Sequence, residues 1–126
     1  MWKYEQGSGR LFNASGTPIA KGYSGHGEGL NNPEKQGERG VGPIPRGKWA
    51  IGAPYMSDTT GRYTMKLLAK DSTPGDDTHT PTGRGAFRMH GDNSRGDKSA
   101  SHGCIIMPFD IRHTVWESGD HELEVV

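Results

Sequence analysis

Short apolar stretches separated by turn-forming residues dominate this chain and predict a mainly β fold. The clearest alternation is at residues 86–90, where Phe87 and Met89 share one face and His90 ends the strand. Gly7, Ser8 and Gly9 separate two short strand-like stretches near the start and predict a hairpin. The predicted strands span residues 2–6, 10–12, 48–52, 62–69, 86–90 and 122–126.

One segment has helical rather than strand periodicity. It lies between Pro108, which suits the start of a helix, and Gly119, which suits a position just past its end. We interpret its apolar side chains as core contacts; they are Phe109, Ile111, Val115 and Trp116. Residues 22–29, with four glycines, and residues 71–85, rich in Asp, Thr, Pro and Gly, are predicted to be loops, the second one exposed.

Composition limits the possible classes of protein. The 126 residues fit a single domain over 1–126, and 15 basic residues balance 15 acidic ones, so no basic surface for nucleic acid is expected. No apolar run approaches the roughly 20 residues that span a bilayer, so membrane insertion is not expected. Residues 1–5 lack the apolar core of a signal peptide, and we expect synthesis in the cytoplasm without a Sec-type signal.

The chemistry concentrates around the only cysteine, Cys104, which follows Ser101, His102 and Gly103. A thiol becomes a strong nucleophile as the thiolate, and a nearby imidazole supplies the base. His90, at the end of the preceding predicted strand, is the candidate base, and His102 is an alternative one. The other interpretation is a buried structural cysteine, because free cysteines usually pack as small apolar groups.

The His90-Gly91 pair, a loop and then Ser101-His102-Gly103-Cys104-Ile105 resembles the catalytic motif of L,D-transpeptidases of the YkuD type. The turn at residues 42–47, Gly-Pro-Ile-Pro-Arg-Gly, is similar to a turn of the same fold. The Trp-Lys-Tyr start and the segments 22–25 and 31–33 make the chain most similar to the type VI secretion L,D-transpeptidase effectors. The resemblance implies a compact β-sandwich of short strands, with one short helix after the cysteine.

The resemblance also implies roles for individual residues. Cys104 matches the nucleophile, His90 the general base, and the Gly91 carbonyl the group that orients the base. Ser101, His102 and Gly103 match the nucleophile turn and oxyanion hole, for which we expect the backbone N–H groups of Gly103 and Cys104. Ile106 stands where many family members have Arg or Asn. The residues considered for substrate binding are Arg88, Asn93, Arg95, Lys98, Tyr23 and His26, while His79, His113 and His121 are interpreted as surface or packing residues.

By resemblance, the substrate is a peptidoglycan stem tetrapeptide, processed without a cofactor by L,D-carboxypeptidase action or by D-amino-acid exchange. The resemblance further implies action in the periplasm of a target bacterium, delivery by a secretion apparatus and a cognate immunity protein. A phage or housekeeping wall enzyme would share this chemistry. Two other hypotheses stay open: a non-catalytic peptidoglycan-binding or interaction domain, and a zinc hydrolase with Cys104, His90 and His102 as ligands.

Overall fold

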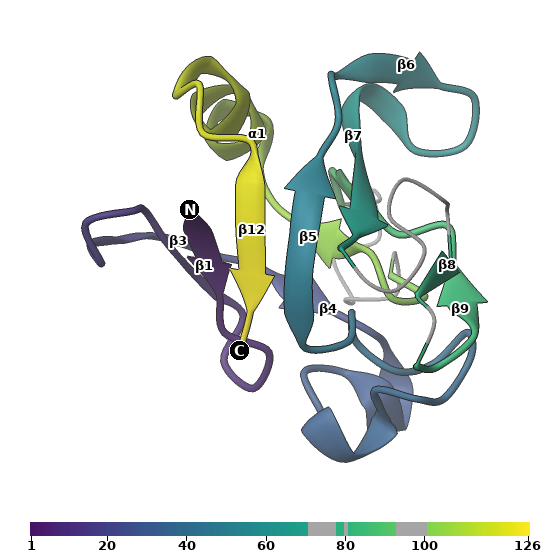
Figure 1. Cartoon of the computed structure of the whole chain (residues 1–126). Helices are drawn as coiled ribbons and strands as arrows, with labels where there is room; N and C mark the ends of the chain where they lie inside the picture. Colours follow the sequence, from purple (N-terminus) through teal and green to yellow (C-terminus); the bar gives the residue numbers. More distant parts are fainter. Residues whose placement is uncertain (71–77, 80, 93–100) are drawn as a thin grey trace.

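The computed structural model describes residues 1–70, 78–79, 81–92 and 101–126 (Figure 1). These residues form a mainly β fold with one short α-helix, which confirms the predicted fold class. The strands are β1 (Trp2–Tyr4), β2 (Arg10–Phe12), β3 (Pro18–Lys21), β4 (Tyr23–Ser24), β5 (Gly47–Ile51), β6 (Tyr55–Ser57), β7 (Gly61–Ala69), β8 (Thr78–His79), β9 (Arg84–Gly85), β10 (Arg88–His90), β11 (Ile105–Ile106) and β12 (Glu122–Val125). The helices are the 3-10 turns η1 (Gly27–Gly29) and η2 (Pro33–Lys35) and the α-helix α1 (Phe109–Glu117).

Most of these strands pair along one continuous path. Its order is β3-β2-β1-β12-β5-β7-β10-β11-β4, with β6 paired to β7 off the path, while β8 and β9 form a separate two-stranded sheet. The two ends of the path, β3 and β4, are consecutive in the chain and are joined by the single residue Gly22. Because one residue spans less than 4 Å, the sheet must curl until its edges meet.

The curled sheet encloses one cluster of buried apolar side chains. Trp49, Met65 and Met89 are each at most 1% exposed and belong to this cluster together with Leu123 of β12 and Val115 of α1. Phe87 and Met89 are both buried, as their alternation predicted. The apolar face of β10, the strand that ends at His90, therefore packs against the core.

Two loop predictions need correction. The glycine-rich stretch 22–29 contains β4, which pairs antiparallel with β11, because Tyr23 and Ser24 complete the edge beside the cysteine segment. In the stretch 71–85, predicted to be exposed, β8 and β9 pair with each other, and His79 and Arg84 are buried. Residues 71–77 and residue 80 of that stretch lie outside the described residues.

The predicted helix is confirmed as α1, but one of its predicted core contacts is wrong. Phe109 is 38% exposed, because it lies in the first turn and stacks edge-on against Tyr63 at 5.3 Å rather than entering the core. Arg112 takes an inward position instead and is 4% exposed. Its guanidinium donates to the carbonyls of Met107 and Tyr63 at 2.6 and 3.1 Å.

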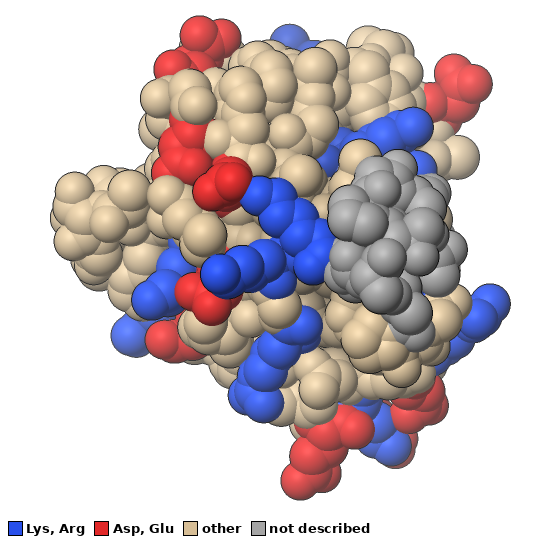
Figure 2. Space-filling model, viewed as in Figure 1, with Lys and Arg blue, Asp and Glu red and all other residues tan. Residues whose placement is uncertain are grey.

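Basic and acidic side chains lie beside one another on the face seen in Figure 2. Among the ion pairs of the described residues, Lys70 and Glu122 have an N–O distance of 2.6 Å. Within the described residues, no helix combines the length and the apolar character needed to cross a bilayer.

Candidate active site

Cys104 lies between the turn formed by residues 101–103 and strand β11. Its side chain is half-buried, and its thiol donates a long hydrogen bond to the carbonyl of Ala86 at 3.8 Å. Ala86 has a φ of +62°, which is uncommon for a residue with a Cβ. Such backbone strain persists only where the surroundings impose it, and here it accompanies a carbonyl directed at the sulfur.

Ser101 holds the cysteine turn in shape. Its buried hydroxyl donates to the carbonyl of Cys104 at 2.5 Å and accepts from the N–H groups of Gly25 at 2.8 Å and Gly103 at 3.1 Å. One donated and two accepted bonds use the full capacity of a hydroxyl. The Gly103 N–H, expected in the oxyanion hole, is therefore already engaged by Ser101 in this structure.

Gly103 occupies a place in the turn that no other residue fits. Its φ is +134°, a region that side chains disfavour. A Cβ there would lie 2.5 Å from Nη2 of Arg84 and 2.8 Å from Cε1 of Phe87. Its carbonyl accepts from the hydroxyl of Ser24 at 2.9 Å, so β4 supports the turn from the other side.

His90 ends β10 and is 4% exposed. Its Nδ1 lies 2.8 Å from the carbonyl of Gly91, which can only accept, so Nδ1 carries the proton and Nε2 is left to take one up. Burial lowers the pKa of His90, and the charge of Arg112 lowers it further, while the Gly91 hydrogen bond and Asp92 act in the opposite direction. The resulting imidazole is neutral and oriented, as a general base must be.

The strand register places this base beside the segment that carries the thiol. β10 and β11 pair in parallel, with Met89 opposite Ile105 and His90 opposite Ile106. Met89 and Ile105 point into the core, so alternation puts His90 on the other face of β10 and predicts the same side for Cys104, which immediately precedes β11.

His102 differs from His90 in its surroundings. Its side chain is exposed, and its ring lies 4.9 Å from the ring of His26. His26 in turn contacts the turn directly, because its Nδ1 is 2.8 Å from the carbonyl of Ser101. His26 and His102 therefore form a pair beside the cysteine turn, rather than a buried base.

Arg84 is a residue of this site that sequence reasoning missed. It is 3% exposed, and its guanidinium donates to four backbone carbonyls, those of Gln36, Gly42, Pro43 and His102, at 2.6 to 3.1 Å. Burial lowers the pKa of Arg84, and an attraction to Cys104 acts in the opposite direction. Nothing in the sequence marks this arginine among the other basic residues.

The remaining candidates for substrate binding are divided. Arg88 donates to the hydroxyl of Tyr55 at 3.0 Å, and Tyr23 donates to Asp92 at 2.6 Å, so both take part in side-chain contacts near the strand ends. Three others lie outside the described residues; they are Asn93, Arg95 and Lys98.

Two cavities flank the segment that carries Cys104. One, of about 410 Å³, includes Arg39, Arg84, Ala86 and His102 in its wall. The other, of about 320 Å³, lies at the end of β11, and its wall includes Ile106.

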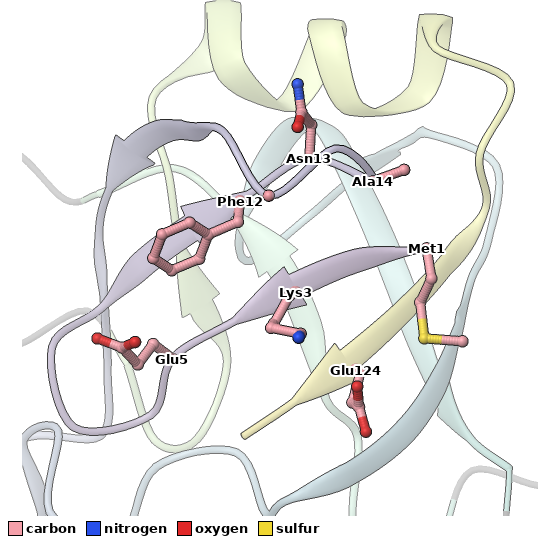
Figure 3. A pocket seen from close by; sticks show the side chains of 8 residues that line it. Met1, Lys3, Glu5, Phe12, Asn13, Ala14 and Glu124 are labelled. Atoms are coloured by element: carbon pink, nitrogen blue, oxygen red, sulfur yellow. The ribbon is translucent and has the colours of Figure 1, made fainter.

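A third cavity, of about 390 Å³, lies against β1 and β2 (Figure 3). It is lined by Lys3, Glu5, Phe12 and Glu124, among others, and contains no cysteine or histidine. It shares no lining residue with the two cavities beside the Cys104 segment, so this cavity belongs to another part of the surface.

The described residues contain no group of three or more His, Cys, Asp or Glu side chains placed to hold a metal ion. Cys104, His90 and His102 thus do not form the ligand set that the zinc hypothesis requires.

Comparison with known proteins places the chain in a family. Searches of curated proteins and of solved structures found no match. A family model described as the Tlde1 domain matches residues 19–124, which include the cysteine turn, His90 and helix α1. The match covers most of the chain, and we conclude that this protein belongs to the Tlde1 domain family, a family of type VI secretion effectors.

Proposed function

We propose that this protein is a cysteine acyltransferase that acts on peptidoglycan stem tetrapeptides. The observation that carries the proposal is that His90 ends β10 and Cys104 directly precedes β11, the strand paired with it, while Nδ1 of His90 is held by the Gly91 carbonyl. A buried structural cysteine would need neither the oriented imidazole nor the polar, hydrogen-bonded turn that presents the thiol. Membership of an effector family with a link to L,D-transpeptidase activity supports the choice of substrate.

The reaction starts with transfer of the Cys104 thiol proton to Nε2 of His90. The thiolate attacks the carbonyl carbon of the third stem residue, at the L-centre of diaminopimelate, and a C–S bond forms. Because Ser101 already engages the Gly103 N–H, we assign the stabilisation of the oxyanion to the N–H of Cys104. The C–N bond to D-alanine then breaks, and His90 returns the proton to the departing amine.

The thioester is then resolved by a second nucleophile. Water, deprotonated by His90, gives a shortened stem peptide and hence L,D-carboxypeptidase action. An amine gives cross-linking or D-amino-acid exchange by the same route. His90 suits this role better than His102, because its ring is buried and fixed by one hydrogen bond, whereas His102 is exposed.

The biological setting proposed for this chemistry is attack on a rival cell. We assign the site of action to the periplasm of a target bacterium, with delivery by a secretion apparatus and protection of the producer by an immunity protein. The same chemistry in a phage or housekeeping wall enzyme is the second candidate. The cysteine turn held by Ser101 supports both candidates equally.

The test is to incubate the protein with purified tetrapeptide muropeptides and a free D-amino acid, and to read the products by mass spectrometry. We expect loss or exchange of D-alanine with the native protein and neither with Cys104→Ala, which removes the sulfur and little volume. His113→Gln, at an exposed position on α1, serves as the matched control and should retain turnover, while His90→Gln should lose it. Unchanged muropeptides with folded native protein would refute the proposed reaction and favour a binding domain.

A further inference from the structure

A cationic cavity lies directly beside the candidate nucleophile. Its wall is made by Arg39, by residues 83–86 and by His102, and its volume is about 410 Å³. Ala86 belongs both to this wall and to the surroundings of Cys104, because its carbonyl accepts the hydrogen bond from the thiol. The cavity and the thiol of Cys104 therefore have Ala86 as a common neighbour.

Arg84 supplies a positive charge that no described carboxylate neutralises. The residue is 3% exposed, and the acceptors recorded for its guanidinium are all backbone carbonyls. Carbonyl dipoles satisfy its N–H groups but leave its net charge in place. A buried charge without a counter-ion is unfavourable, and an anion in the adjoining cavity would relieve this.

Arg39 adds a second guanidinium at the mouth of the same cavity. Its side chain is exposed, and Nη2 donates to the carbonyl of Gly83 at 3.1 Å. Among the ion pairs between described residues, none includes Arg39. Its charge repels that of Arg84 and contributes to the lowered pKa of Arg84. The two like charges thus converge on a space whose described wall contains no acidic residue.

We propose that this cavity is a carboxylate subsite, in which Arg39 donates hydrogen bonds to a carboxylate of the acyl donor next to the scissile bond and the buried charge of Arg84 attracts that carboxylate. The inference rests on the proposed function for the identity of the donor. The two carboxylates of a stem tetrapeptide that are separated from the scissile carbonyl by the fewest bonds are that of the terminal D-alanine and that on the side chain of diaminopimelate. Ile106 cannot provide a charge for either group, and the cavity supplies one from a different part of the chain.

The experiment uses Cys104→Ala protein, so that binding is measured without turnover. Calorimetric titration compares the tetrapeptide with two analogues, one amidated at the terminal carboxylate and one at the diaminopimelate side chain. Arg39→Gln, introduced into this background, should weaken binding of the tetrapeptide about tenfold, as expected for loss of one charge-assisted hydrogen bond. The analogue that lacks the recognised carboxylate should bind more weakly from the start and be indifferent to Arg39→Gln.

Arg10→Gln is the matched control, because Arg10 is an exposed arginine on β2 and should leave all three affinities unchanged. We substitute Arg39 rather than Arg84, because loss of Arg84 would also leave four backbone carbonyls without a hydrogen-bond donor. The subsite is refuted if all three peptides bind alike, if none binds, or if Arg39→Gln weakens every peptide equally. If native protein fails to release D-alanine while the Arg39-dependent discrimination persists, the subsite stands and the proposed reaction fails.

Discussion

Removal of a single hydroxyl, in Ser101→Ala, should destabilise the whole protein. The hydroxyl is fully buried and makes three hydrogen bonds with backbone groups, to Cys104, Gly25 and Gly103. Its loss leaves two N–H groups and one carbonyl without this partner, and each unsatisfied buried group costs about 1–3 kcal/mol. Taking the low end for each group gives a loss of about 3 kcal/mol, a large part of the roughly 5–15 kcal/mol that stabilises an ordinary domain.

The assay is urea unfolding followed by tryptophan fluorescence, supported by the thermal midpoint. A loss of about 3 kcal/mol corresponds to a drop in Tm of roughly 10–15 °C for a chain of this length. Ser57→Ala is the matched control, because Ser57 also accepts from two backbone N–H groups, those of Thr59 and Thr60, but does so in an open turn. Water replaces its hydroxyl there, and we expect a change below about 1 kcal/mol.

The result that would refute this reasoning is a Ser101→Ala protein as stable as Ser57→Ala. That outcome would mean that the cysteine turn rearranges to satisfy its own backbone groups, or that water enters freely. Either result would remove the argument that Ser101 holds the thiol in a prepared position. If Ser101→Ala is destabilised and Ser101→Thr is not, the loss of the hydroxyl is the cause.

Three further predictions concern other buried groups. Because the pKa of His90 is lowered in the folded protein, the unfolded chain binds a proton more readily than the folded chain does. The free energy of unfolding should therefore fall as the pH drops below about 6.5. Urea titrations at pH 7.5 and 5.5 should show a smaller fall for His90→Gln than for the native protein. The buried hydroxyl of Tyr4 has no hydrogen-bond partner among the described residues, so Tyr4→Phe should raise the free energy of unfolding by about 1 kcal/mol in the same assay, and a loss of stability would contradict this. Gly103→Ala should lower Tm and turnover together, because its Cβ would meet Arg84 at 2.5 Å, whereas Gly7→Ala, in open space, should change turnover little.

The local parts of the fold could be predicted from the sequence. The hairpin of β1 and β2 forms around Gly7-Ser8-Gly9, and α1 has both its apolar spacing and its boundary residues. Strands β3, β4 and β11 could not be predicted, because they show no alternation of apolar and polar residues, whereas the equally short β1 and β12 do. They are strands because the neighbouring strands pair with them, and pairing between distant segments leaves no local pattern.

The site likewise contains residues that could be predicted from the sequence and residues that could not. Cys104 and its turn stand out because a lone cysteine after Ser-His-Gly is a local pattern, and His90 stands out because it ends an alternating strand. Arg84 does not, because a buried arginine looks like any surface arginine until its four carbonyl acceptors are brought around it. Arg112 was missed for the same reason. Its sequence position on α1 suggests an exposed polar side chain, but contacts with β7 and with the carbonyl of residue 107 bury it.

The place of β12 in the sheet has a consequence for the order of folding. This strand lies between β1 and β5, pairing in parallel with the first and antiparallel with the second, so that Trp2 lies opposite Leu123 (Figure 1). Until residues 122–125 have left the ribosome, the hairpin at the beginning of the chain has no neighbour on its inner side. The alignment of β1 beside β5 must therefore wait for the four residues of β12, which lie between these two strands in the sheet although they follow both in the chain.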